Sequence, residues 1–380
     1  MQWRPLSRRG FMKLLVGCTV ALGLYALGSM PKSESPPSPL LPYKRPASHY
    51  RKLSNSIVQC ELCFRRCLIP NGGAGHCTNR RNEDGRLYNV VYERPCAVQI
   101  DPIEKEPQFH MLPGSHILCL GTAGCNFKCS FCQNWPISTR SIEETGYLDF
   151  PCEDVVRQAS RSSLSISFTY NEPTVAYEYL HDTVKLARDV GVRSLFHTNG
   201  GMNPDALRDL LRYVDAVTVD LKGFSAGFYR ATSTSDLAPV LETLKIIKQH
   251  KIWFEIVNLV IPTLNDDLKM IREMCVWIRD NLGEDVPLHF NRFFPAHRLQ
   301  NLPPTPVETL EAARRIALAE GLAYVYIGNL PGHLANSTFC PSCGDRIIHR
   351  KHFSVLENNV KEGRCKFCGH RIPGIWSSPW

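Results

Sequence analysis

The chain has 380 residues, of which 43% are apolar, so it can bury a hydrophobic core and is not a globally disordered protein. A formal net charge of +8 over this length is typical of an ordinary basic surface and gives little reason to expect a nucleic-acid partner. The 16 cysteines are numerous, and most fall in close groups, which favours metal sites over a secreted disulfide framework.

The first 29 residues have the pattern of a targeting segment. Arg8 and Arg9 stand ahead of an apolar run of about 15 residues, which is short for a membrane span. The paired arginines resemble the twin-arginine signal of bacteria. We therefore expect residues 1–29 to export the protein or anchor it to a membrane, on a side that the sequence does not specify; a cytoplasmic location is the alternative. Residues 30–48 are rich in Pro and Ser and are typical of a tether.

Residues 49–110 form a Cys-rich segment. Four of its cysteines fall within 18 residues, and nearby glycines leave the backbone free to wrap around an ion. Four thiolates complete the shell of a zinc ion or of an iron–sulfur cluster, and the spacing does not decide between the two. The four predicted ligands are Cys60, Cys63, Cys67 and Cys77.

Residues 111–332 alternate between short apolar runs and helical patterns. Helices are predicted over residues 175–190, after the N-cap pair Asn203-Pro204, and over residues 266–282, where Gly283 ends the helix. Repeated strand–helix–strand units imply a parallel sheet with crossover helices. The predicted fold is α/β, a partial TIM-like (β/α) barrel of parallel strands. The strand candidates are residues 116–121, 165–170, 193–198, 215–222, 252–261, 287–293 and 323–328.

Polar motifs follow several of these strands. In β/α barrels the active site lies where strands end and the following loops begin, so motifs in these positions converge on one rim. Taken alone, each polar residue is equally well explained as a helix cap or a turn residue. Their regular placement after successive strands favours a shared site. The residues are Asn171, Glu172, Thr198, Asn199, Asp220, Lys222 and Asn258.

The loop after the first of these strands holds Cys125, Cys129 and Cys132, spaced three residues and then two. A structural zinc site needs four protein ligands. A cubane of four irons held by three thiolates instead keeps one iron open, and a ligand with an amine and a carboxylate can chelate it. S-adenosylmethionine has both groups and is a radical-generating cofactor. The alternative is a zinc ion with a distant fourth ligand.

This spacing resembles the cluster motif of the radical S-adenosylmethionine (radical SAM) superfamily. The whole pattern, over roughly residues 55 to 377, is most similar to the AmmeMemoRadiSam-system branch, which is similar to pyruvate formate-lyase-activating enzymes. The resemblance implies a [4Fe–4S] cluster on Cys125, Cys129 and Cys132, with S-adenosylmethionine at the open iron.

The resemblance also implies roles for the polar residues. Phe131 would lie beside the adenine, Asn171 and Glu172 would bind the amino group, and Asn258 would contact the ribose. The stretches that contain Thr198, Asn199, Asp220 and Lys222 resemble the matching regions of the activating enzymes and would complete the cosubstrate site.

Residues 333–380 carry two C-x-x-C pairs, each followed closely by a glycine, on either side of two short β-rich runs. This pattern predicts a zinc ribbon with a closed shell of four thiolates, in which the ion supplies the folding energy of a small domain. The ligands are Cys340, Cys343, Cys365 and Cys368.

The leading functional hypothesis is a radical SAM enzyme that cleaves S-adenosylmethionine reductively and abstracts hydrogen from a substrate. Its partners would be a one-electron donor and, as in activating enzymes, a protein substrate. Nucleic acid is not expected, because the ribbon lacks a dense basic and aromatic stripe. The alternative is a membrane-tethered iron–sulfur electron-transfer or metal-binding protein without radical catalysis.

Overall fold

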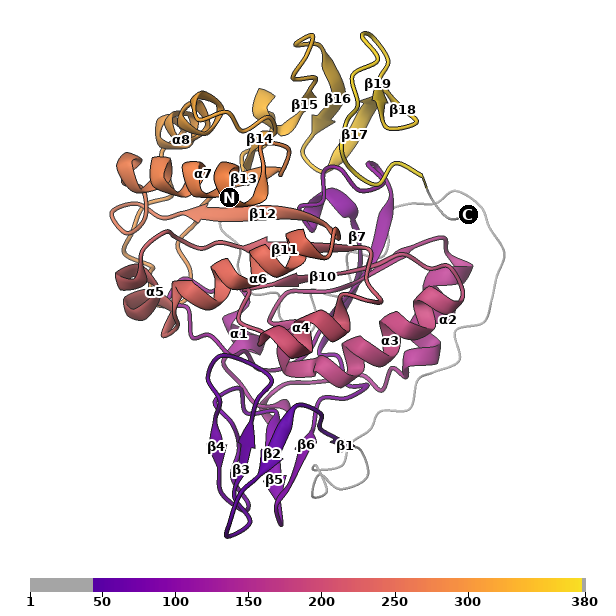
Figure 1. Ribbon diagram of the computed structural model, residues 1–380, viewed down its shortest axis with the longest axis vertical. Helices are drawn as coiled ribbons and strands as arrows, with labels where there is room; N and C mark the ends of the chain where they lie inside the picture. The colour runs from indigo at the N-terminus through magenta and orange to yellow at the C-terminus, as the bar shows by residue number, and fades with distance from the viewer. Residues whose placement is uncertain (1–43, 378–380) are drawn as a thin grey trace, which may run out of the picture. The chain divides into compact units, whose positions relative to one another are not determined.

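The structure of the protein is a computed structural model that describes residues 44–377 (Figure 1). The predicted leader, residues 1–29, and most of the predicted tether, residues 30–48, lie outside the described residues. None of the helices between residues 44 and 377 has the length and apolar character that crossing a membrane requires. Export or anchoring by the leader therefore stays a prediction.

The centre of the fold is a sheet of eight strands in the order β14-β13-β12-β11-β10-β9-β8-β7. Neighbouring strands from β8 to β14 are parallel, and β7 (Ala97–Pro102) pairs antiparallel with β8 at one edge. The sheet is therefore open in its hydrogen bonding, with β14 and β7 as its two edge strands. The parallel strands are β8 (His116–Gly121), β9 (Ser165–Phe168), β10 (Ser194–Thr198), β11 (Ala216–Asp220), β12 (Trp253–Val260), β13 (Leu288–Arg292) and β14 (Val325–Gly328).

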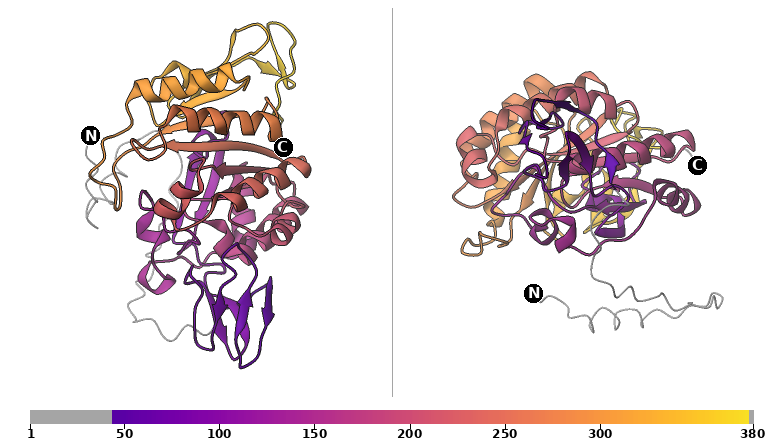
Figure 2. Two further views of the ribbon diagram at one scale, coloured as in Figure 1. Left: turned by 60° about the vertical axis from the view of Figure 1, so that its left-hand side comes forward. Right: turned by 90° about the horizontal axis from the view of Figure 1, so that it is seen from below.

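Helices connect the parallel strands and lie along the outside of the sheet (Figure 2). Strands such as β9 are buried at every position, as expected for a parallel sheet covered on both faces. The α-helices are α1 (Trp135–Ser138), α2 (Cys152–Arg161), α3 (Tyr177–Asp189), α4 (Pro204–Leu210), α5 (Ala226–Ser233), α6 (Leu237–Gln249), α7 (Leu268–Leu282) and α8 (Val307–Ala319). Short 3-10 helices are η2 (Ile103–Lys105), η3 (Ile142–Glu144), η4 (Pro173–Ala176) and η5 (Leu334–Asn336).

The predicted helices are present, with differences at their starts. The helix predicted from residue 266 begins at Leu268, because the Asp267 carboxylate accepts a hydrogen bond from the Met270 N–H at 2.8 Å and caps it. Its end is as predicted, at Gly283 with a φ of +100°. The helix predicted from residue 175 is α3, and the residues just before it form the 3-10 helix η4.

Before the central sheet, the Cys-rich segment forms two small antiparallel sheets, in the orders β1-β6-β5 and β2-β3-β4. Arg80 lies in one of them and pairs with Glu178 of α3 through two contacts of 2.9 Å; both side chains are almost fully buried. Removing one partner of such a pair would leave an uncompensated buried charge, so this pair fixes the segment against α3. The strands are β1 (Arg45–Pro46), β2 (Tyr50–Lys52), β3 (Val58–Cys60), β4 (Leu68–Ile69), β5 (Arg80–Glu83) and β6 (Arg86–Asn89).

After the central sheet, the chain forms the short antiparallel strands β15 (Thr338–Phe339), β16 (Arg346–Lys351), β17 (Ser354–Asn358), β18 (Val360–Lys361) and β19 (Arg364–Cys365). Four thiols converge there. The Cys340 and Cys368 sulfurs are 3.6 Å apart, the Cys343 and Cys365 sulfurs are 3.8 Å apart, and all four lie within 4.8 Å of one another. Sulfurs around one tetrahedral zinc stand about 3.8 Å apart. The group therefore fits a single metal ion.

The predicted α/β class and the mostly parallel sheet are confirmed. The barrel shape, the identity of the metal in the C-terminal group and the predicted boundaries at residues 49–110, 111–332 and 333–380 stay predictions.

We predict that Cys340→Ser and Cys365→Ser each release about one zinc ion per chain, because each removes one of four ligands. The melting temperature should fall as well, since the ion supplies folding energy to this small part of the chain. Metal analysis and calorimetry measure both effects. Cys96→Ser is the control, because Cys96 is a half-buried cysteine outside the predicted groups. Unchanged zinc content in both variants would rule out the site.

Candidate active site

The three cysteines of the central motif lie on the loop between β8 and α1. Gly124 stands just before Cys125 with a φ of +81°, and a Cβ atom added to it would be 2.3 Å from the carbonyl oxygen of Cys77. A side chain would collide with backbone there, and the positive φ also favours glycine. Gly124 therefore lets the loop turn tightly against the Cys-rich segment.

Backbone hydrogen bonds fix the middle of this loop against the end of α5. The Lys128 N–H donates to the Ser233 carbonyl at 3.0 Å, and the Ser130 N–H donates to the Thr232 carbonyl at 2.8 Å. Because the two bonds flank Cys129, the backbone that carries this thiol has a defined position.

The Cys125 thiol is partly buried and accepts hydrogen bonds from two donors. The Phe127 N–H donates to its sulfur at 3.3 Å, and Asn199 Nδ2 donates to it at 3.7 Å. Burial, and then the nearby Glu172 carboxylate, raise the pKa of Cys125, and burial also raises the pKa of Cys129. Such thiols become thiolates when a metal supplies the compensating positive charge.

Glu172 is fully buried beside this loop. Its Oε1 accepts hydrogen bonds from the Thr174 N–H at 3.0 Å, the Thr174 hydroxyl at 2.5 Å and the Thr198 hydroxyl at 2.9 Å. Its Oε2 accepts from the Asn199 N–H at 2.7 Å. Burial raises the pKa of Glu172. The carboxylate thus joins the loops after β9 and β10, and protein donors occupy both of its oxygens.

Three polar side chains form a half-buried group at the ends of β10 and β11. Asp220 contacts Lys222 Nζ at 2.7 Å through one oxygen and His197 Nε2 at 3.0 Å through the other. Burial alone would raise the pKa of Asp220, but the charges of Lys222 and His197 bring it below its ordinary value. Burial would lower the pKa of Lys222, but Asp220 and then Cys129 raise it. Lys222 therefore keeps a positive charge near the Cys129 thiol.

Of the remaining predicted residues, Asn171 contacts the cysteine loop, Phe131 belongs to it, and Asn258 lies on β12. Asn171 donates to the Gly124 carbonyl at 2.7 Å, so it supports the cysteine loop directly. The Phe131 ring is stacked on Phe228 with the ring centres 6.2 Å apart. Asn258 donates to the Leu221 carbonyl at 2.7 Å, while its buried Oδ1 has no hydrogen-bond partner among the described residues.

These residues fit an iron–sulfur cluster better than a single ion. Within residues 44–377, the C-terminal group of four is the one place where three or more donor atoms of His, Cys, Asp or Glu lie within 4.8 Å of one another. The thiols of Cys125, Cys129 and Cys132 are therefore more widely spread than that group, which favours a cluster, because a cluster binds each thiolate at a separate iron. The unpaired Asn258 Oδ1 leaves one buried acceptor for a cosubstrate.

Two residues that contact the Asp220 and Lys222 group, His197 and Tyr229, are not among the site residues predicted from the sequence. His197 bonds to Asp220, and the Tyr229 hydroxyl accepts a hydrogen bond from the Lys222 N–H at 3.0 Å. His197 could have been found, because it is a polar residue that follows the apolar pair Leu195-Phe196 and directly precedes Thr198. Nothing in the local sequence distinguishes Tyr229 from an ordinary core aromatic.

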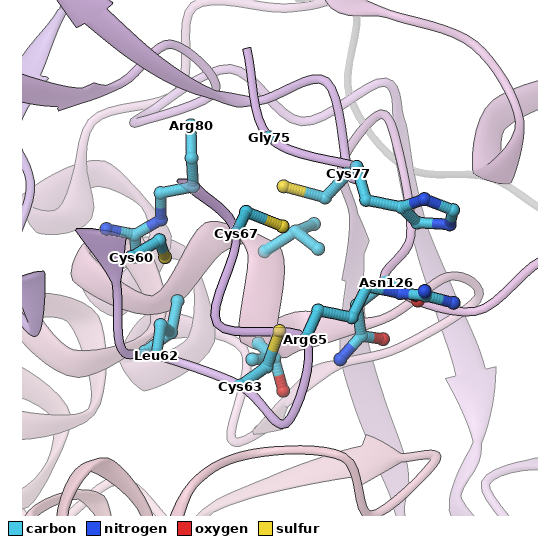
Figure 3. Close-up of a pocket in the computed structure, with 12 residues that line it drawn as sticks. Cys60, Leu62, Cys63, Arg65, Cys67, Gly75, Cys77, Arg80 and Asn126 are labelled. Atoms are coloured by element: carbon cyan, nitrogen blue, oxygen red, sulfur yellow. The ribbon is translucent and has the colours of Figure 1, made fainter. Parts of the chain in front are cut away.

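The predicted ligands Cys60, Cys63, Cys67 and Cys77 line one cavity next to the cysteine loop (Figure 3). Burial raises the pKa of Cys60 to about 11 and that of Cys63 to about 12. Both thiols would therefore stay protonated at neutral pH without a metal.

Comparison with known proteins identifies the family. Residues 120–275 match the family model of the Radical SAM superfamily. An uncharacterized protein of Methanocaldococcus jannaschii is 44% identical over 331 residues, which cover 86% of this chain and 98% of that protein. The pyruvate formate-lyase-activating enzyme of Clostridium pasteurianum is 22% identical over 41% of this chain and 67% of its own length.

A solved domain of a pyruvate-formate lyase-activating enzyme from Bacteroides vulgatus aligns with a TM-score of 0.39 and 17% identity, over 43% of this chain and 99% of that domain. The matched model begins at the last strand residues before the three cysteines, and the match with the M. jannaschii protein extends over most of the chain. This chain therefore belongs to the radical SAM superfamily and is an enzyme of the radical SAM type.

Proposed function

We propose that the protein cleaves S-adenosylmethionine reductively and abstracts a hydrogen atom from a partner protein, in the manner of a glycyl-radical activating enzyme. The observation that carries this proposal is the arrangement of the Cys125 loop. Three thiols that are more widely spread than the C-terminal group follow the first parallel strand, and the Lys222 cation lies near one of them, Cys129.

A bound [4Fe–4S] cluster and S-adenosylmethionine would supply one-electron cleavage of the sulfonium and a 5′-deoxyadenosyl radical. Cys125, Cys129 and Cys132 would hold the cluster. Asn199 donates to the Cys125 sulfur at 3.7 Å, which stabilises charge on that ligand. Lys222, kept charged by Asp220, offsets the negative charge of the thiolates and of the cosubstrate carboxylate.

Two further residues would position the cosubstrate. Phe131 is an aromatic residue of the cysteine loop, and its ring would lie beside the adenine. The Asn258 Oδ1 suits a ribose hydroxyl, because a buried acceptor without a donor is costly until a ligand supplies one. Three of the four hydrogen bonds to Glu172 go to Oε1 and one goes to Oε2, so Oε2 would offer its second lone pair to the amino group.

Support for a protein substrate comes from the edge of the sheet. β7 is an edge strand, and with residues 144–148 it lines a hollow that also includes Pro136 and Ile137 of α1, close after Cys132. Ile100, Tyr147 and Leu148 are large apolar residues of these segments that remain exposed. An extended peptide adds to such an edge through backbone hydrogen bonds, with apolar side chains giving contact area. Relatives named as activating enzymes favour the same substrate class.

We predict that the reconstituted, dithionite-reduced protein converts S-adenosylmethionine to 5′-deoxyadenosine, and that Cys129→Ala reduces this conversion to background. The reason is that each cysteine would hold one iron corner. Chromatography of the nucleoside products under anaerobic conditions measures it. Cys96→Ser should keep the activity, and full activity in Cys125→Ala, Cys129→Ala and Cys132→Ala alike would refute the proposal in favour of simple electron transfer or metal binding.

We predict that Asn258→Ala weakens binding of S-adenosylmethionine by about tenfold, as expected for the loss of one buried hydrogen bond. Equilibrium dialysis of the reconstituted protein measures the affinity. Asn336→Ala is the matched control, because Asn336 is also buried, also donates to a backbone carbonyl and also has an unpaired Oδ1, but it belongs to η5 and bonds to β14. Equal affinity in wild type and Asn258→Ala would remove Asn258 from the site.

For the substrate class, we predict that cell extract of the source organism stimulates 5′-deoxyadenosine formation through its high-molecular-mass fraction. Pretreating that fraction with a protease, and then inhibiting the protease, should abolish the stimulation, because the hydrogen donor would be a polypeptide. Stimulation that survives the protease, or that is found in the small-molecule fraction, would contradict a protein substrate while leaving radical catalysis in place.

A further inference from the structure

The cavity formed by Cys60, Cys63, Cys67 and Cys77 is built by the local backbone. Cys60 and Cys67 face each other at the hairpin of β3 and β4, where the Cys60 N–H donates to the Cys67 carbonyl at 2.9 Å. Cys77 reaches the same space from a turn that the Thr78 N–H closes on the Gly75 carbonyl at 2.8 Å. Figure 3 shows the sulfurs of the four cysteines around one space.

The spacing of these thiols differs from that of the C-terminal group. Among the described residues, no three of the four Cys60-group sulfurs lie within 4.8 Å of one another, whereas all four C-terminal sulfurs do. One chain thus contains a compact set that matches a tetrahedral ion and an open set that does not. Four thiolates on the corners of an iron–sulfur cluster are farther apart than four thiolates on one ion, because each binds a different iron or one of two irons.

Two buried donors line the cavity without partners. Arg80 gives both terminal nitrogens to Glu178, which leaves its buried Nε unbonded among the described residues. Asn126 is 1% exposed, and its Nδ2 also has no hydrogen-bond partner there. A cluster offers sulfide and thiolate sulfurs as acceptors, and hydrogen bonds to them set its reduction potential.

The cavity shares a wall with the Cys125 site. Asn126, the neighbour of Cys125, lines the cavity and accepts a hydrogen bond of 2.8 Å from Asn199, which also donates to the Cys125 sulfur. The Cys77 carbonyl lies directly against Gly124, and the rings of Phe64 and Phe127 meet with centres 5.5 Å apart. The two groups of thiols are therefore separated by little more than one layer of residues.

We propose that Cys60, Cys63, Cys67 and Cys77 hold a second iron–sulfur cluster that passes one electron to the Cys125 site. The electron would come from an external low-potential one-electron donor. The second cluster is reduced by one electron and is reoxidised when the electron moves on, with no bond made or broken. The metal assignment stands on the geometry alone, whereas the electron transfer rests on the proposed function.

The first experiment isolates the site. The triple variant Cys125→Ala, Cys129→Ala and Cys132→Ala is reconstituted anaerobically with iron, sulfide and zinc together, and metals, acid-labile sulfide and electron paramagnetic resonance spectra are measured. We expect about two to four iron atoms with matching sulfide, about one zinc, and a reduced-cluster signal that S-adenosylmethionine does not alter, since every iron has its cysteine. A second zinc in place of iron, or no metal beyond the first zinc, would overturn the proposal.

A second variant keeps the Cys125 site and removes the new one. Cys63→Ser with Cys77→Ser should lose the iron that the triple variant retains, while about one zinc stays in the C-terminal group as evidence that the chain has folded. Cys96→Ser is the matched control and should keep all the iron. Iron content equal to wild type in the double variant would show that these cysteines hold no cluster.

The last experiment measures how many 5′-deoxyadenosine molecules each reduced chain forms, which gives the number of electrons it stored. Protein is reduced with dithionite, freed of excess reductant and given excess S-adenosylmethionine, so that each stored electron cleaves one molecule. We expect about two 5′-deoxyadenosines per wild-type chain and about one in Cys63→Ser with Cys77→Ser. About one in both would refute electron transfer between the sites. None in either would refute the proposed function and leave the metal assignment to be judged from the iron and zinc counts.

Discussion

A carboxylate buried as fully as Glu172 costs free energy unless donors replace the water it has lost. Thr174, Thr198 and Asn199 supply four hydrogen bonds, and these can form only when the loops after β9 and β10 are closed around the carboxylate. The hydrogen bond from the Asn199 N–H to Glu172 fixes the position of Asn199. Its side chain then donates hydrogen bonds to the Cys125 sulfur and to Asn126. The position of the cysteine loop thus depends on satisfying one buried charge.

The sequence predicted the parallel strands and the helices around this site well, because their signals are local. Apolar strands and helix caps follow periodicity and nearest neighbours, and the polar residues after each strand fall at one edge of a parallel sheet by topology. Asn203 shows that long-range contacts of a side chain cannot be predicted in this way. It precedes α4 at the predicted cap position, yet its side chain donates to the Glu61 and Cys63 carbonyls, about 140 residues away in the chain. The sequence carries no sign of that contact.

The same limit applies to the Cys-rich segment. Its four cysteines were found from their spacing. A zinc ion and an iron–sulfur cluster both need four cysteine ligands, so the sequence does not distinguish them. The difference lies in how far apart the folded backbone holds them, and that depends on long-range contacts such as the pair of Arg80 with Glu178, 98 residues away. The C-terminal pairs are different, because each short C-x-x-C turn holds two thiols close together, and the turns after β15 and at β19 meet in one compact group.

Burial then separates the roles of the thiol groups. Cys343 and Cys368 of the compact group are exposed, as suits an ion that serves the fold and exchanges nothing with a substrate. The Cys60 and Cys125 groups have no exposed cysteine and lie next to each other, with Asn126 lining the space between them and Lys222 near Cys129. Low exposure raises the cost of charge on sulfur, so in the proposed electron path fixed donors and cations would set how readily each group accepts an electron. A site that must take electrons one at a time and keep water from a radical needs this kind of enclosure.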